Sequence, residues 1–167
     1  MANNKITRVN HEFEIFINLN SKILILGSMP SILSRKHSFY YMNKTNRFYK
    51  VLANVFNDDL FLNEDITIKK KALDKHNIAL FDVISECDII NSSDASISNI
   101  VVNDINKIVK DYNITKIILN GSKAYEIFIK YFPNLDDISI KLPSTSAANA
   151  SFSLAKLIDK WNVLKDL

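Results

Sequence analysis

The stretch ILILGSMPS, residues 23–31, decides how the chain folds. It begins with a short, branched and continuously apolar run, which is typical of a strand buried on both faces of a parallel sheet. The run ends at Gly27, one of only two glycines in 167 residues. Glycine permits a sharp exit from a strand and a close approach between the backbone and a ligand. The stretch therefore predicts a central strand followed by a loop in which the glycine makes room for something.

Three further apolar runs predict strands, and amphipathic segments between them predict helices. The expected strands are residues 22–26, 78–83, 115–119 and 139–142, and the expected helices are residues 46–56, 68–77, 103–112, 122–132 and 153–164. Asn103 and Ser122 are candidate helix caps. Alternation of strands with helices predicts an α/β fold with a mostly parallel sheet covered on both faces.

Length and composition limit the functional classes. A chain of 167 residues with 47% hydrophobic content fits one folded domain over residues 1–167. The single cysteine, Cys87, excludes an internal disulfide and a four-cysteine metal cluster. No apolar run approaches the roughly 20 residues that span a membrane. The net charge of +3 permits a polyanionic partner. We expect a cytoplasmic monomer that does not bind membranes.

Three loops follow predicted strands whose ends share one edge of the sheet, where open α/β sheets bind ligands. They contain residues 27–31, residues 121–123 and the hydroxyl-rich stretch LPSTSAANA, residues 142–150. The alternative is ordinary turn and cap chemistry, which each loop taken alone would favour. Their common position favours a binding site at this edge.

The stretch HSFYYMNKTNRFYK, residues 37–50, combines aromatic rings, amides and cations. Aromatic faces stack on nucleobases, and cations contact phosphates. Tyr40 and Tyr41 precede the predicted helix and are candidates for base stacking, whereas Phe48 fits the helix core. Lys44, Arg47 and Lys50 are candidates for phosphate contacts or for solvated surface.

Five motifs in register resemble those of the uracil-DNA glycosylase superfamily, and most closely its hypoxanthine-DNA (deoxyinosine) glycosylase branch. They are ILILGSMPS, FYYMNKTNRFYKVL, LFDV, LNGSKAYEIF and LPSTSAANA, and the similarity extends from His11 to Trp161. The resemblance implies a three-layer α/β/α sandwich with a central four-stranded parallel sheet. It also implies a monofunctional enzyme of base excision repair that binds double-stranded DNA containing a damaged base and hydrolyses an N-glycosidic bond without a metal or cofactor.

The resemblance also implies roles for individual residues. The base pocket would be formed by Gly27, Ser28, Met29, Pro30, Ser31, Tyr40, Tyr41, Phe48 and Asp82. DNA would be held by Gly121, Ser122, Lys123, Ser144, Thr145, Ser146 and Asn149. Many superfamily members carry an Asp or Asn in the first loop to activate or orient water, but this chain has Ser28 and Met29 there. The candidates for orienting water are therefore Asn43, which we favour, and Asn46, which could instead cap the helix.

Three other functions compete with this prediction. The enzyme could act mainly on uracil or another deaminated base. The same aromatic and basic residues would also suit a DNA-binding module that recognises lesions without cutting. The third alternative is an α/β enzyme that acts on free nucleotides and holds a single phosphate in its loops.

Overall fold

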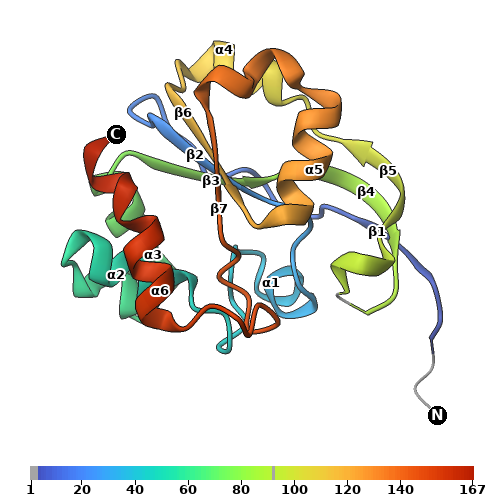
Figure 1. Ribbon diagram of the computed structural model, residues 1–167, viewed down its shortest axis with the longest axis horizontal. Helices are drawn as coiled ribbons and strands as arrows, with labels where there is room; N and C mark the ends of the chain where they lie inside the picture. Colours follow the sequence, from blue (N-terminus) through green and yellow to red (C-terminus); the bar gives the residue numbers. More distant parts are fainter. Residues whose placement is uncertain (1–3, 92) are drawn as a thin grey trace.

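The computed structural model describes residues 4–91 and 93–167, and a parallel sheet of order β3-β2-β6-β7 lies at its centre (Figure 1). The strands are β2 (Ile23–Gly27), β3 (Ile78–Asp82), β6 (Lys116–Asn120) and β7 (Ser139–Leu142). Ile25 of β2 lies opposite Leu80 of β3 and Ile118 of β6. The four predicted strands are confirmed.

Helices cover both faces of this sheet (Figure 1). One layer contains α2 (Phe48–Phe56), α3 (Ile66–Lys75) and α6 (Leu154–Trp161), and the other contains α4 (Ile105–Tyr112) and α5 (Ser122–Tyr131). The short helix α1 (Ile32–His37) follows β2, and the 3-10 helices are η1 (Asp59–Leu62), η2 (Asp94–Ser96), η3 (Pro133–Ile138) and η4 (Asn162–Asp166). The expected three-layer α/β/α fold is confirmed.

The alternation of side chains along β2 explains why its whole apolar run is buried. Ile23 and Ile25 face the layer that contains α2 and α6, whereas Leu24 and Leu26 face the layer that contains α5. Trp161 of α6 is fully buried, and its indole N–H donates to the carbonyl of Pro143 at 2.9 Å. This contact ties the end of the fold to the loop that follows β7.

A second, antiparallel sheet of order β1-β4-β5 was not predicted from the sequence. It contains β1 (Thr7–Asn10), β4 (Ile84–Ile89) and β5 (Ser98–Val102). Only Val83 separates β3 from β4, so the chain passes almost directly from one sheet to the other. None of the helices within residues 4–91 and 93–167 has both the length and the apolar character needed to cross a membrane.

Both predicted caps are wrong. Asp104, not Asn103, caps α4, and its carboxylate accepts from the backbone N–H of Lys107 at 3.1 Å. Gly121 occupies the cap position of α5, and Ser122 is the first helical residue. Gly121 has φ of +99°, a conformation that side chains other than glycine rarely adopt. The second glycine is therefore required by backbone conformation.

Candidate active site

A cavity of about 430 Å³ lies where the loops after β2, β3, β6 and β7 meet. This volume is within the range of small-ligand sites. The structure brings most of the predicted site residues to its wall: Gly27, Ser28, Met29, Pro30, Ser31, Tyr40, Tyr41, Asn43, Asn46, Asp82, Ser144, Thr145 and Ser146. The structure therefore brings these predicted residues together at one edge of the sheet, and their roles stay a prediction.

Gly27 makes room for a carboxylate. A Cβ atom at this position would lie 2.6 Å from Asp82 Oδ1 and 3.4 Å from the Tyr41 hydroxyl. The first distance is shorter than any normal contact, so a larger residue would displace the Asp82 side chain. The close approach that the sequence predicted is thus made to Asp82, at the floor of the cavity.

Asn46 is held by a chain of partly buried hydrogen bonds. Its Oδ1 accepts from the Thr145 hydroxyl at 2.8 Å and from the backbone N–H of Phe48 at 3.0 Å. The Thr145 hydroxyl in turn accepts from Asn120 Nδ2 at 3.0 Å, and Asn120 Oδ1 accepts from the backbone N–H of Thr145. Thr145 is completely buried. It therefore positions Asn46 and does not contact DNA in this conformation, contrary to the role implied by the resemblance.

The orientation of both candidate amides is fixed by backbone donors. Asn43 Oδ1 accepts from the backbone N–H and the hydroxyl of Thr45, at 3.0 and 2.8 Å. A backbone N–H can only donate, so the acceptor in each amide must be the oxygen. Asn43 Oδ1 and Asn46 Oδ1 each accept two hydrogen bonds already. Each side chain therefore has its NH₂ group left to donate, and within the described part of the chain neither NH₂ has an acceptor.

The aromatic side chains do not all face the cavity. Tyr40 is 2% exposed and donates through its hydroxyl to the carbonyl of Glu14. Tyr41 stacks on Phe48, with ring centroids 3.9 Å apart and planes 22° apart. Phe48 is completely buried and lies behind Tyr41, outside the cavity wall. The structure therefore places Phe48 as support for Tyr41 and not as a direct stacking surface for a base.

Tyr41 is held in an unusual conformation at the cavity wall. Its φ of 57° is uncommon for a residue other than glycine, and such conformations concentrate at functional sites. Its hydroxyl lies beside the Asn120 amide and is buried without a hydrogen bond of regular geometry to any described residue. Burial raises the pKa of the Tyr41 phenol, so the ring stays neutral.

Two carboxyl groups line the cavity. Asp82 Oδ2 lies 2.8 Å from His11 Nε2, and burial raises the pKa of Asp82 while the contact with His11 lowers it. Asp94 is exposed as a residue, but its Oδ1 accepts from the Ser28 hydroxyl at 2.8 Å. Desolvation of its carboxyl raises the pKa of Asp94, and the hydrogen bond from Ser28 opposes this. Among the described residues, no group of three or more His, Cys, Asp or Glu side chains could hold a metal ion.

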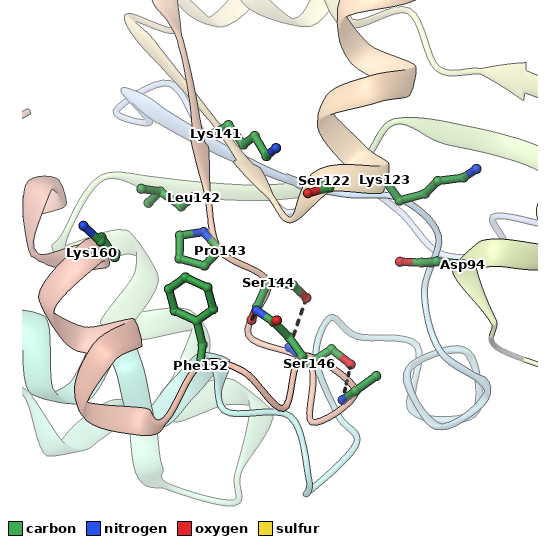
Figure 2. A pocket seen from close by; sticks show the side chains of 12 residues that line it. Asp94, Ser122, Lys123, Lys141, Leu142, Pro143, Ser144, Ser146, Phe152 and Lys160 are labelled. Carbon is green, nitrogen blue, oxygen red and sulfur yellow. Dashed lines mark hydrogen bonds between the residues drawn. The ribbon is translucent and has the colours of Figure 1, made fainter.

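A second depression of about 580 Å³ adjoins the first and shares Asp94, Ser144, Ser146 and Ala148 with it. Figure 2 shows three lysines around it: Lys123 of α5, Lys141 of β7 and Lys160 of α6. Ser122 and Asn149 also line it, whereas Gly121 lines neither hollow. We call this depression the lysine groove.

Arg47 holds the loop between β7 and α6. Its guanidinium donates to the backbone carbonyls of Ser146 at 2.8 Å, Asn149 at 3.2 Å and Phe152. The backbone N–H of Arg47 also donates to the carbonyl of Thr145. The sequence suggested that Arg47 contacts phosphate or solvent, but its donors are used inside the protein.

Sequence reasoning missed three residues of the site. Asn120 ends a predicted strand at the correct edge, so its position was a usable signal. His11 lies before the first predicted strand, and only the fold brings it to Asp82. Asp94 lies in a polar segment without periodicity, and nothing in the sequence pattern marked it.

Comparisons with known proteins agree with this geometry. The family model "Uracil DNA glycosylase superfamily" matches residues 15–167. A hypoxanthine DNA glycosylase of Methanosarcina acetivorans is 32% identical over 151 residues, which cover 87% of this chain and 91% of that protein. A hypoxanthine DNA glycosylase of Methanosarcina barkeri is 33% identical over 119 residues, covering 68% and 72% of the two chains.

A solved structure is also similar. It is the solution NMR structure of a protein from Methanosarcina acetivorans that is described as a proposed uracil DNA glycosylase. It superposes with a TM-score of 0.76 at 28% identity, over 92% of this chain and 96% of that one. On these grounds the chain belongs to the uracil DNA glycosylase superfamily.

Proposed function

We propose that this protein is a DNA glycosylase that flips a deaminated base out of duplex DNA and releases it as free hypoxanthine. The observation that carries the proposal is the cavity, which holds a fixed amide and a buried carboxylate and adjoins the lysine groove. The names of the two Methanosarcina relatives support hypoxanthine as the substrate.

Base recognition would use the floor of the cavity. Hypoxanthine presents an acceptor at O6 and a donor at N1–H. Asp82 Oδ1 accepts no hydrogen bond from described residues and would accept from N1–H. Met29 and Ser31 line the cavity, and their backbone N–H groups would donate to O6 or N7. Such donors stabilise negative charge on the departing base. At N1 adenine presents an acceptor in place of this donor, and it would leave Asp82 Oδ1 unpaired.

Hydrolysis would use Asn46. As the C1′–N9 bond breaks, its electron pair leaves with the base, positive charge develops on the sugar, and water adds to C1′. The added water then loses a proton to solvent, and the base anion takes up a proton from solvent to become free hypoxanthine. The NH₂ group of Asn46 would donate to that water and hold it beneath C1′, because the amide oxygen is occupied. This orients water and does not deprotonate it, which suits a reaction whose transition state needs little push from the nucleophile. We favour Asn46 over Asn43 because the buried Thr145, itself bound to Asn120, holds the Asn46 amide, whereas Asn43 is held by the exposed Thr45.

The lysine groove would hold the phosphates next to the flipped nucleotide. Extrusion of a base costs a few kcal/mol and is cheapest for a poorly paired base. Contacts from Lys123, Ser122 and Asn149 to the DNA backbone would offset part of this cost. The loop of residues 142–150 would support the flipped nucleotide through Ser144 and Ser146.

We further propose that residues 1–167 form one glycosylase domain that acts as a monomer in the cytoplasm without a metal. The buried, unpaired Cys87 supports a reducing compartment.

The test is single-turnover excision on matched duplexes that contain deoxyinosine, deoxyuridine or deoxyxanthosine. Faster release of hypoxanthine than of the other bases supports the proposal, and much faster release of uracil would overturn the substrate assignment. Asn46→Ala should abolish excision and retain DNA binding, while the matched Asn43→Ala variant should retain most excision. Binding of deoxyinosine DNA by the unmodified protein with no release at all would instead identify a lesion-binding module. Faster cleavage of free deoxyinosine monophosphate than of DNA would favour a nucleotide enzyme.

A further inference from the structure

His11 and Asp82 form a buried pair at the floor of the cavity. Their side chains are only 3% and 5% exposed, and His11 Nε2 lies 2.8 Å from Asp82 Oδ2. His11 Nδ1 lies 2.9 Å from the carbonyl oxygen of Phe13. The imidazole contacts the rings of Phe13 and Phe81, at centroid distances of 4.7 and 5.0 Å. The orientation of His11 is therefore fixed on both sides.

The contacts determine how many protons the pair holds. The Phe13 carbonyl can only accept, so His11 Nδ1 must carry a hydrogen. The contact between Nε2 and Asp82 Oδ2 then contains one further hydrogen, because two bare acceptors would repel each other at 2.8 Å. If this hydrogen is on Nε2, then His11 is an imidazolium and Asp82 is a carboxylate.

We propose that His11 is a positioning residue that keeps Asp82 ionised, so that Asp82 Oδ1 presents a hydrogen-bond acceptor to the N1–H of the flipped base. This rests on the proposed function. Oδ1 is the oxygen that does not contact His11, and it lies against Gly27 at the cavity. His11 thus acts on the base through Asp82 and does not touch it.

The surroundings support this assignment. The other titratable groups that face Asp82 among described residues are Tyr40, Tyr41 and Asp94. Burial raises the pKa of both phenols, so they remain neutral, and Asp94 would add negative charge. None of these groups favours an ionised Asp82, and burial itself raises the pKa of Asp82. Burial is the larger effect and raises the pKa of Asp82 overall, and among these groups only His11 opposes it, through its hydrogen bond and its charge.

The first experiment needs no mutation. The chain has three histidines, so ¹⁵N-edited NMR of the imidazole nitrogens can separate the buried His11 from His37 and His76. At neutral pH we expect both His11 nitrogens to be protonated. A neutral imidazole, with a hydrogen on Nδ1 only, would place the shared proton on Asp82 and overturn the proposal.

The second experiment compares His11→Gln with Phe81→Leu in single-turnover excision of hypoxanthine across pH. Glutamine can still donate to Asp82 but carries no charge, so more Asp82 is protonated and the acid limb of the profile should move up by about one to three pH units. Phe81→Leu removes packing against His11 and leaves the pair intact, so its acid limb should not move.

A His11→Gln profile that falls equally at every pH would show a merely structural role and overturn the inference. If His11→Gln does not fold, the NMR result decides alone. Failure of the proposed function is distinguishable, because the unmodified protein would then release no hypoxanthine at any pH.

Discussion

Replacing Thr145 with valine should separate the support of Asn46 from the support of the loop. Valine has nearly the shape of threonine but lacks the hydroxyl. The substitution therefore removes the hydrogen bond to Asn46 Oδ1 at 2.8 Å and the one from Asn120 Nδ2 at 3.0 Å. The backbone contacts of residue 145 with Asn120 and Arg47 remain. The change is thus confined to one buried oxygen atom.

The magnitude follows from that oxygen atom. A lost hydrogen bond and a donor left unpaired in the interior together cost about 2–3 kcal/mol. For a chain of this size the melting temperature should fall by about 5–10 °C. Asn46 keeps only the bond from the Phe48 N–H, so its amide can rotate away from the position that holds water. Misplacement of this kind reduces a rate by about a hundredfold.

Circular dichroism melting and single-turnover excision of hypoxanthine measure the two effects. Thr145→Ser is the matched control, since it keeps the hydroxyl and loses a methyl group. Its excision rate should stay near that of the unmodified protein, with a stability loss of about 1 kcal/mol. If Thr145→Val melts and excises like the unmodified protein, then the chain of hydrogen bonds does not position Asn46 and the reasoning is refuted.

Five further substitutions test other parts of the structure. Arg47→Lys should lower excision more than overall stability, because a single ammonium cannot replace a guanidinium that contacts several carbonyls. Limited proteolysis should then cleave faster within residues 142–152, and an unchanged cleavage pattern would contradict this prediction. Gly121→Ala should cost about 1–3 kcal/mol from its positive φ alone, measured by urea unfolding, and a neutral result would mean that the backbone relaxes. Lys141→Ala and Lys160→Ala should each reduce the salt dependence of DNA binding by about one unit of slope, and an unchanged slope would place the DNA outside the lysine groove. Lys75 and His76 lower the pKa of Asp58 to about 2. Their contacts with the Asp58 carboxylate therefore stabilise the fold above about pH 4, and this stabilisation is lost as the pH falls toward the lowered pKa. The melting temperature of Asp58→Asn should vary less with pH in this window than that of the unmodified protein.

The parallel sheet was predictable because its strands are buried on both faces. That burial selects unbroken apolar runs such as ILIL in β2 and IALF in β3, which stand out from the polar segments around them. The antiparallel sheet lacks this signal. β5 is largely exposed, and its pairing with β4 is irregular at two places, so no clean alternation of apolar and polar residues survives in the sequence.

The position of the site was predictable, but its internal contacts were not. Strand ends meet at one edge in any fold of this class, so the loops with Gly27, Gly121 and residues 142–150 could be placed together from the pattern, although Gly121 itself lines neither hollow. The reason for Gly27 is the Asp82 carboxylate, which comes from a different strand. Long-range contacts of this kind depend on register and loop paths that no local pattern encodes.

The choice between the two asparagines illustrates the same limit. From the sequence, Asn46 resembled a helix cap, which favoured Asn43 as the residue that orients water. In the structure, Asn46 does accept from a backbone N–H near the start of α2, but it also contacts Thr145, which is 99 residues away. A local role and a site role can therefore fall on the same side chain, and only the second contact distinguishes them. The preference for Asn46 remains a proposal that the paired alanine variants test.

The most direct test of the central claim is the chemical identity of the products formed from a duplex that contains one deoxyinosine. Mass spectrometry of the reaction should find free hypoxanthine together with an intact strand that carries an abasic site. Recovery of the substrate strand unchanged, under conditions in which the protein binds it, would contradict the assignment of the cavity as a site of base release.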